Sequence, residues 1–204
     1  MALKEHEISM LAKFLPANTA EEVIDYMHSH KIHLSIKKER RRILGDYRPA
    51  HNGKPHRISI NGNLNEYHFL ITFLHELAHL LTFLNHQGNV NPHGQEWKNV
   101  FKILLKRFQD KKVFPEDVEV ALDKSMNNLA ASTCSDPYLY KVLHKYDHKK
   151  DVFLVEQIAI GDTFKTDKGQ VFKMVEKRRT RYLCEEVKTG KRYLFPSIYE
   201  VSKL

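Results

Sequence analysis

The pattern of apolar positions predicts two long helices in the middle of the chain. Between residues 64 and 85, apolar side chains fall on nearly every side of a helical wheel, which predicts a buried central helix. Residues 87–92 interrupt this pattern, and from Trp97 to Phe108 apolar residues recur every three or four positions. We therefore expect a second, amphipathic helix that packs back on the same core.

Shorter patterns predict further elements on either side. Thr19-Ala-Glu-Glu22 has the form of a capping box, in which the Thr hydroxyl and the Glu carboxylate satisfy backbone donors at the start of a helix. Apolar residues alternate at 32–36 and again at 57–60, which predicts strands. Residues 116–130 fit another short helix, whereas 132–150 is polar and shows no clear pattern.

The sequence pattern changes after residue 150, where short runs rich in β-branched and aromatic residues alternate with residues typical of turns. The runs lie at 152–155, 162–165, 170–175, 181–187 and 192–195. Five strands in so short a domain suggest a small barrel or a sandwich, and because closure removes exposed edges we expect a small barrel of the SH3-like kind. The sequence thus predicts an α+β domain over residues 1–150 and a small all-β module over 151–204.

Composition bears on partners more than on fold. The 204 residues are 42% apolar and 28% charged, within the ordinary globular range. Lys and Arg number 33 against 25 Asp and Glu, which gives a net charge of +8 and makes a polyanion such as DNA a candidate partner. The excess is shared by both regions, so charge alone does not assign this role to either.

Three features bear on the compartment. Cys134 and Cys184 lie far apart without a Cys-x-x-Cys motif, so neither a disulfide framework nor a Cys-rich zinc ribbon is predicted, and two unpaired thiols fit a reducing environment. The N-terminal segment lacks the continuous apolar stretch of a signal peptide. The most apolar window, 67–84, contains a Glu and His residues that a membrane-spanning helix would carry only at a cost. We expect a soluble, cytoplasmic protein with no membrane partner, and the oligomeric state stays open.

The candidate chemistry lies in the central helix, at His75-Glu-Leu-Ala-His79. Residues 75 and 79 differ by about 40° and one turn, so both imidazoles project from one face and can bind one metal ion. Glu76 is turned to the side, where its carboxylate can act as a general base on a metal-bound water, as in zinc peptidases. The alternative is a buried helix whose two His and one Glu are hydrogen-bonded to neighbouring loops.

A catalytic zinc site needs a third protein ligand and an open position. Thr82 and Asn85 stand where the metzincin pattern requires Gly and His, which excludes that class. His93, at the start of the next helix, is the favoured third ligand, with Glu96 as the alternative. His68 and His86 each lie about two turns from a ligand, roughly 10 Å along the helix, which is too far to share the ion.

With His75-Glu-Leu-Ala-His79 followed by His93-Gly-Gln-Glu-Trp97, the chain resembles the SprT-like family of zinc metallopeptidases, which includes the eukaryotic protease Spartan. The resemblance covers roughly residues 15–130 and includes Arg42-Ile-Leu-Gly-Asp-Tyr47. It implies a mini-zincin fold, zinc held by His75, His79 and His93, and Glu76 as the catalytic residue. Spartan-type members degrade proteins crosslinked to DNA. Bacterial members typically continue into a Cys-based zinc ribbon, whereas here only Cys134 stands near that position, so a DNA-binding role of the ribbon does not carry over.

The primary hypothesis is therefore a zinc-dependent endopeptidase that acts on protein or peptide substrates, including DNA-associated or DNA-crosslinked proteins. The substrate would lie extended along an edge strand, for which 57–60 is the candidate. No second donor for the oxyanion can be named. A zinc-binding scaffold without catalytic activity is an alternative.

A second alternative is a nucleic-acid-associated protein. The densest basic clusters are Arg40-Arg41-Arg42 and Lys177-Arg178-Arg179 with Arg181, and the aromatic residues Tyr182, Tyr193 and Phe195 lie in the same β module as the second cluster. Such residues are typical of base-stacking small barrels. Solvated charged faces and core aromatics would give the same pattern.

Overall fold

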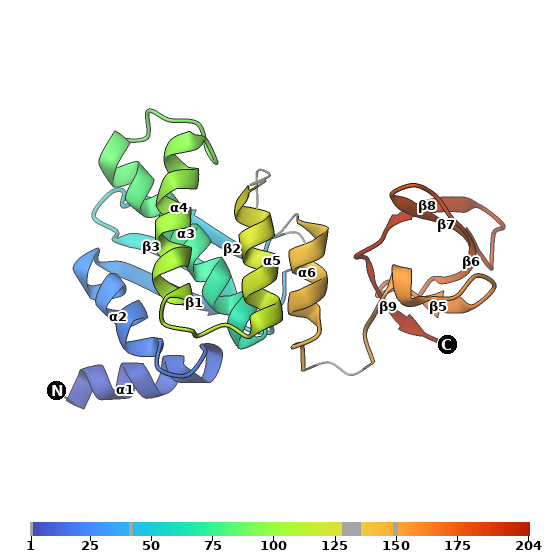
Figure 1. Ribbon diagram of the computed structural model, residues 1–204, viewed down its shortest axis with the longest axis horizontal. Coiled ribbons are helices and arrows are strands. Elements are labelled where there is room, and N and C mark those ends of the chain that lie inside the picture. The colour runs from blue at the N-terminus through green and yellow to red at the C-terminus, as the bar shows by residue number, and fades with distance from the viewer. Residues whose placement is uncertain (1, 41–42, 128–135, 149–150) are drawn as a thin grey trace. The chain divides into compact units, whose positions relative to one another are not determined.

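The computed structural model describes residues 2–40, 43–127, 136–148 and 151–204. The chain is of mixed α+β class and divides into two compact units, residues 1–146 and 147–204, each with its own hydrophobic core (Figure 1).

The first unit contains a three-stranded sheet of β1 (Ile32–Lys37), β2 (Gly45–Arg48) and β3 (His56–Asn61). The strand order is β1-β3-β2, with β1 parallel and β2 antiparallel to β3. Both predicted strands are present, but the segment 57–60 forms the middle strand of this sheet. It is therefore not the edge strand that the sequence interpretation assigned to substrate; the sheet edges are β1 and β2.

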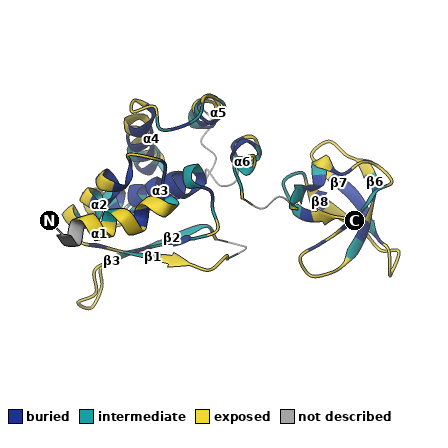
Figure 2. Ribbon diagram, turned by 90° about the horizontal axis from the view of Figure 1, so that it is seen from below, coloured by how far each residue is buried: buried dark blue, intermediate teal, exposed yellow. Residues whose placement is uncertain are grey.

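The helices of the first unit gather on one face of this sheet (Figure 2). They are α1 (Ala2–Leu11), the short 3-10 helix η1 (Ala12–Phe14), α2 (Ala20–Ser29), α3 (Glu66–His86), α4 (Gln95–Gln109), α5 (Glu116–Asn127) and α6 (Pro137–His144). Ile58 and Ile60 of β3 are fully buried beneath them. The amphipathic α4 packs on α3 through residues such as Trp97, Phe101 and Phe108, as its apolar spacing predicts.

Helix α3 is the centre of the core. Asn65 caps its first turn by accepting from the His68 N–H at 2.9 Å, and the same side chain donates to the Leu143 carbonyl at 2.9 Å, which ties the helix start to α6. The helix ends at Gln87, whose left-handed backbone (φ 50°) reverses the chain. By length and composition α3 could cross a membrane, but 72% of its apolar window is buried inside the protein, as expected for a core helix.

The start of α2 differs from the predicted capping box. Thr19 has helical backbone angles (φ −109°, ψ −20°), and its hydroxyl donates to the Pro16 carbonyl at 2.7 Å instead of accepting from the helix. Glu22, the other member of the predicted box, forms ion pairs with Arg107 and Lys111 near the end of α4. A tertiary contact between α2 and α4 has replaced the local one.

The second unit is an antiparallel sheet with the strand order β4-β9-β5-β6-β7-β8. Its strands are β4 (Phe153–Leu154), β5 (Thr163–Lys165), β6 (Val171–Lys177), β7 (Arg181–Glu186), β8 (Arg192–Pro196) and β9 (Glu200–Lys203), with the 3-10 turn η3 (Val155–Gln157) after β4. Each of the five predicted runs overlaps a strand, and β9 is additional. The pairings leave β4 and β8 as edges, so the described strands form an open sheet and not the closed barrel predicted from the sequence.

Candidate metal centre and active site

Three imidazoles from two segments of the first unit meet at one point. His75 and His79 lie one turn apart on α3, and His93 lies just before α4. Their Nε2 atoms form a triangle with sides of 3.3 Å (His75 to His79), 3.0 Å (His79 to His93) and 3.1 Å (His93 to His75). The periodicity of α3 and the chain reversal after it are enough to produce this arrangement.

The triangle fits a bound zinc ion better than a hydrogen-bonded cluster. Each Nε2 atom offers either one proton or one lone pair, so three of them cannot all be satisfied by one another. Zinc–nitrogen distances of about 2.0–2.1 Å at the tetrahedral angle place two ligand nitrogens about 3.3 Å apart, close to the observed separations. Three protein ligands leave a fourth position open, as in catalytic zinc sites.

Burial keeps these imidazoles in the neutral form that binds metals. It lowers the pKa of His75 to about 3 and that of His79 to about 4, and the neighbouring imidazoles act in the same direction. The pKa of His93 is also lowered, first by burial and then by the charge of Lys98. The lone pairs at Nε2 are therefore available without prior loss of a proton near neutral pH.

His93 reaches the other two through an unusual backbone conformation. Its φ is 60°, in the left-handed region that is uncommon for residues other than Gly, Asn, Asp and His. Gly94 follows as the cap of α4, and its backbone N–H donates to the Asn91 carbonyl at 2.9 Å, which closes the turn.

Trp97 forms a wall against all three imidazoles. Its ring centroid lies 4.6 Å from that of His75, 4.7 Å from His93 and 5.3 Å from His79, and its other neighbour is Phe101, stacked at 4.9 Å. The side chain is 1% exposed. The sequence places Trp97 on the apolar face of the second helix and in the His93-Gly-Gln-Glu-Trp97 motif, but it does not predict the contacts of this side chain with the imidazoles. Trp97 lies in the first turn of α4, four residues after His93.

Glu76 is buried beside this cluster, on the side of α3 that faces β2. Burial is the main cause that raises the pKa of its carboxyl group to about 8, and the negative charge of Asp46 acts in the same direction. A hydrogen bond from the Tyr47 backbone N–H opposes this shift, as does the more distant charge of Arg40. A carboxyl group tuned toward neutral pH next to three convergent imidazoles is suited to proton transfer.

The other histidines and the alternative ligand stand apart from the cluster. Glu96, on the first turn of α4, does not belong to the group of metal-ligating atoms that lie within 4.8 Å of one another around His93 in the described part of the chain. His68 is buried near the start of α3, and His86 is exposed at its end. The structure thus brings together the two His of the helix and the third from the following loop.

The basic residues singled out in the sequence have different surroundings. Arg40 is half-buried, and its guanidinium hydrogen-bonds to β3 and to the Leu44 carbonyl, while Arg41 and Arg42 lie outside the described residues. In the second unit, Lys177, Arg178, Arg179 and Arg181 are all exposed where β6 turns into β7. Among the nearby aromatics, Tyr182 and Phe195 are buried in the core and Tyr193 is 41% exposed.

Comparison with protein families matches residues 7–134, more than half of the chain, to the SprT-like family. The chain belongs to the SprT-like family. The match spans the sheet of the first unit, α3 with its His-Glu motif and α4. The family is zinc-associated and is consistent with a metallopeptidase-like domain. No curated protein and no solved structure matches the chain in the corresponding comparisons.

Proposed function

We propose that the first unit is a zinc-dependent endopeptidase of the zincin type. The observation that carries this proposal is the convergence of three neutral imidazole nitrogens, within 3.3 Å of one another, beside a buried glutamate. His75, His79 and His93 are the proposed zinc ligands and Glu76 the proposed catalytic residue. The family supports the same assignment.

The roles of the chain's own groups follow from their positions. When bound, zinc supplies Lewis acidity that acidifies a water molecule and polarises a carbonyl group, and its charge favours the ionised Glu76 carboxylate. Glu76 then takes the proton of the attacking water and returns it to the leaving amine. The buried Trp97 wall keeps bulk water from the far side of the imidazoles.

Strand β2 is the proposed docking edge for an extended substrate. It is an edge strand of the sheet, and its Tyr47 N–H already bonds to Glu76. An added peptide strand uses backbone hydrogen bonds, so β2 can hold substrates of varied sequence next to the catalytic group.

The test compares the wild type with Glu76→Gln, which keeps the shape of the side chain but removes its basicity. Both proteins should retain one zinc per chain, and peptide cleavage should fall at least about a thousandfold in the variant, from the loss of proton transfer. A variant as active as the wild type would contradict the mechanism. Zinc without cleavage in the wild type would instead favour a zinc-binding scaffold.

A second function, nucleic-acid binding, is proposed for the second unit. It is supported by the four basic residues exposed at the β6–β7 turn, of which Arg178 pairs with Glu176. Phosphate contacts of this kind would bring the peptidase to proteins bound or crosslinked to DNA.

A further inference from the structure

Strand β2 approaches α3 unusually closely at Gly45. A Cβ atom at this position would lie 2.6 Å from Oε1 and 2.8 Å from Cγ of Glu76, and 2.8 Å from Cγ2 of Thr72. Non-bonded carbon atoms favour separations of about 3.5–4.0 Å, so no side chain fits between the strand and the helix. Glycine therefore allows the backbone of β2 to lie directly against the Glu76 side chain.

Two residues later the same strand donates a hydrogen bond to the carboxyl group, through the Tyr47 N–H. Gly45 and Tyr47 lie opposite Ile60 and Ile58 of β3, both fully buried against the helices, so this is the inner side of the strand. The position of the Glu76 side chain is thus determined by contacts with β2 as well as by α3, the helix that carries it.

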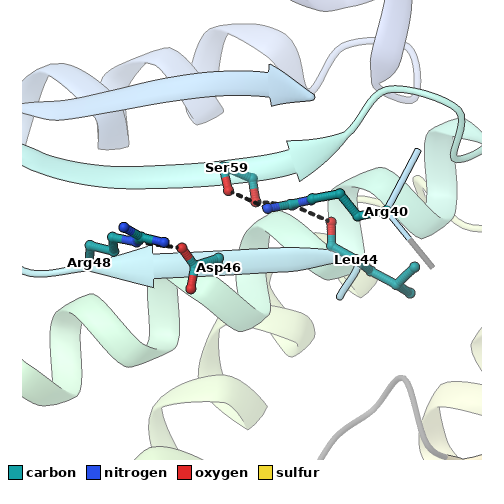
Figure 3. A network of polar contacts seen from close by, with 5 residues as sticks. All are labelled: Arg40, Leu44, Asp46, Arg48 and Ser59. Atoms are coloured by element: carbon teal, nitrogen blue, oxygen red, sulfur yellow. Dashed lines mark hydrogen bonds and ion pairs between the residues drawn. The ribbon is translucent and has the colours of Figure 1, made fainter. Parts of the chain in front are cut away.

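The start of β2 is itself held by two side chains, Arg40 and Asn61, each of which bonds to the segment of the other. Figure 3 shows the bonds of Arg40 to Ser59 and Leu44. The Arg40 guanidinium donates to Asn61 Oδ1 at 2.8 Å, to Ser59 Oγ at 2.9 Å, to the Ser59 carbonyl at 3.2 Å and to the Leu44 carbonyl at 3.3 Å. Asn61, which is 1% exposed, donates in return to the carbonyls of Arg40 at 2.9 Å and Ile43 at 3.1 Å. We call Arg40 and Asn61 the clasp.

The clasp acts on the residue next to Gly45. The Leu44 carbonyl accepts both from Arg40 and from the Asn61 backbone N–H, the latter at 2.9 Å. It cannot move without breaking both bonds, and the peptide that leads into Gly45 is therefore fixed against β3.

We propose that β2 is a positioning strand for Glu76, with Gly45 and the clasp residues Arg40 and Asn61 as positioning residues. The role of Glu76 in catalysis rests on the proposed function; its placement by β2 does not. In this inference Arg40 positions β2 within the first unit, and it is no longer counted among the basic residues considered for nucleic-acid binding. The inference also gives β2 two roles, because the strand that holds Glu76 is the strand proposed to bind the substrate.

The first experiment measures the contact between Gly45 and Glu76 by thermal unfolding of the full chain. Gly45→Ala should lower Tm by about 4–8 °C, as expected for one overpacked contact in a domain of this size. In a Glu76→Ala background the same change should lower Tm by about half as much, because the contact with Thr72 remains; adding Thr72→Ser should remove most of the rest. Equal losses in the wild-type and Glu76→Ala backgrounds would overturn the proposal.

The second experiment separates positioning from stability. Arg40→Lys keeps the charge but loses the planar fork that bonds to Ser59, Asn61 and Leu44. We expect kcat per bound zinc to fall about tenfold, since a small displacement of a catalytic group affects the chemical step. Zinc content should equal that of the wild type, because none of the three His lies on β2.

The matched control is Arg192→Lys, a conservative change of another hydrogen-bonded arginine, which donates to Glu185 at 3.2 Å in the second unit. It should leave kcat unchanged. An Arg40→Lys variant with lower Tm but wild-type kcat per zinc would show a purely structural role and overturn the proposal. If the wild type cleaves no peptide, the proposed function fails, and the unfolding experiment alone decides whether β2 positions Glu76.

Discussion

The indole ring of Trp97 lies edge-on to the imidazole of His75, with the ring centroids 4.6 Å apart and the planes at 61°. The same ring contacts His79 and His93, so one buried side chain packs against all three imidazoles. Groups that orient metal ligands commonly change metal affinity by about 10–100-fold when removed.

Trp97→Leu should therefore weaken zinc binding at least about tenfold, measured by titration against a competing chelator. Trp97→Phe should have a smaller effect, because the indole N–H has no hydrogen-bond partner among the described residues and the aromatic wall is kept. Phe108→Leu, at a fully buried position of the same helix, is the control for lost packing. Equal loss of zinc affinity in this control would point to general destabilisation.

Removal of zinc should lower the stability of the first unit by mass action. Free zinc at about a hundred times its Kd adds about 2.7 kcal/mol, which corresponds to roughly 5–11 °C in Tm. His93→Ala should abolish the difference in Tm between zinc-loaded and chelator-treated protein, whereas Glu96→Ala should retain it. A difference that survives in His93→Ala but not in Glu96→Ala would assign the third ligand to Glu96.

The contact between α2 and α4 gives a prediction on stability. The Glu22 side chain is only 10% exposed and pairs with Arg107 and Lys111. Glu22→Ala should lower the free energy of unfolding by about 1–3 kcal/mol in denaturant titrations, because it removes a largely buried partner of two cations. The exposed pair of Lys106 and Asp110 is the comparison, and Asp110→Ala should change the free energy of unfolding by less than about 0.5 kcal/mol.

The turn between β2 and β3 should respond to pH through His56. Its Nδ1 accepts from the Ala50 N–H at 3.1 Å and lies 3.0 Å from the Tyr47 hydroxyl, and burial, followed by the charge of His30, lowers its pKa below 6.5. A lowered histidine pKa means that the unfolded chain binds more protons, so this contribution to stability is complete above pH 6.5 and is lost as the pH falls toward the folded-state pKa.

The comparison with His56→Asn isolates this effect, since Asn can accept the same hydrogen bonds but does not titrate. Unfolding at pH 7.5 and pH 5 should show a smaller loss of stability in the variant than in the wild type. An NMR titration should place the His56 pKa below 6.5; a value above it would contradict the environment described for the turn.

Nucleic-acid binding by the second unit should depend on the salt concentration and on the basic residues at the β6–β7 turn. Replacing Lys177, Arg179 and Arg181 together with Gln should weaken DNA binding and reduce the slope of log affinity against log salt by about two to three. Replacing Lys188 and Lys191, which are exposed at the β7–β8 turn, is the control and should have less effect. Affinity that does not depend on salt, or equal effects of both sets, would exclude the proposed interface.

Local periodicity explains how far the sequence predicted this site. The spacing of His75 and His79 specifies one helical face, and the break at residues 87–92 specifies a reversal, so the approach of His93 could be anticipated. The contact between Gly45 and Glu76 could not, because it depends on where β2 sits in the sheet. Strand β3 is the middle strand because it pairs with β1 on one side and with β2 on the other, and nothing in its alternating sequence distinguishes a middle strand from an edge strand.

Two predictions about the fold were wrong, the capping box at Thr19 and the closed barrel of the second unit, and the reasons are related. Thr19 has the residue type and spacing of a cap, but Glu22 pairs with Arg107 on α4 and with Lys111 just after it, and Thr19 makes no side-chain cap hydrogen bond. The expected barrel rests on the removal of exposed edges, whereas the last strand, β9, pairs with both β4 and β5, and β4 and β8 stay as edges. Its sequence, Glu200-Val-Ser-Lys203, buries only Val201 and therefore gives a weak strand pattern.

The left-handed backbone of His93 has a consequence for how this centre could be adjusted. Two of the proposed ligands, His75 and His79, lie on a helix at the centre of the hydrophobic core, so the fold of the domain sets their placement. The third proposed ligand, His93, lies in the short connection between α3 and α4, in which Gln87 and His93 both have left-handed backbones (φ 50° and 60°). Changes in the length or rigidity of that connection would retune the affinity for the ion, and its rate of release, without disturbing the packing of the domain.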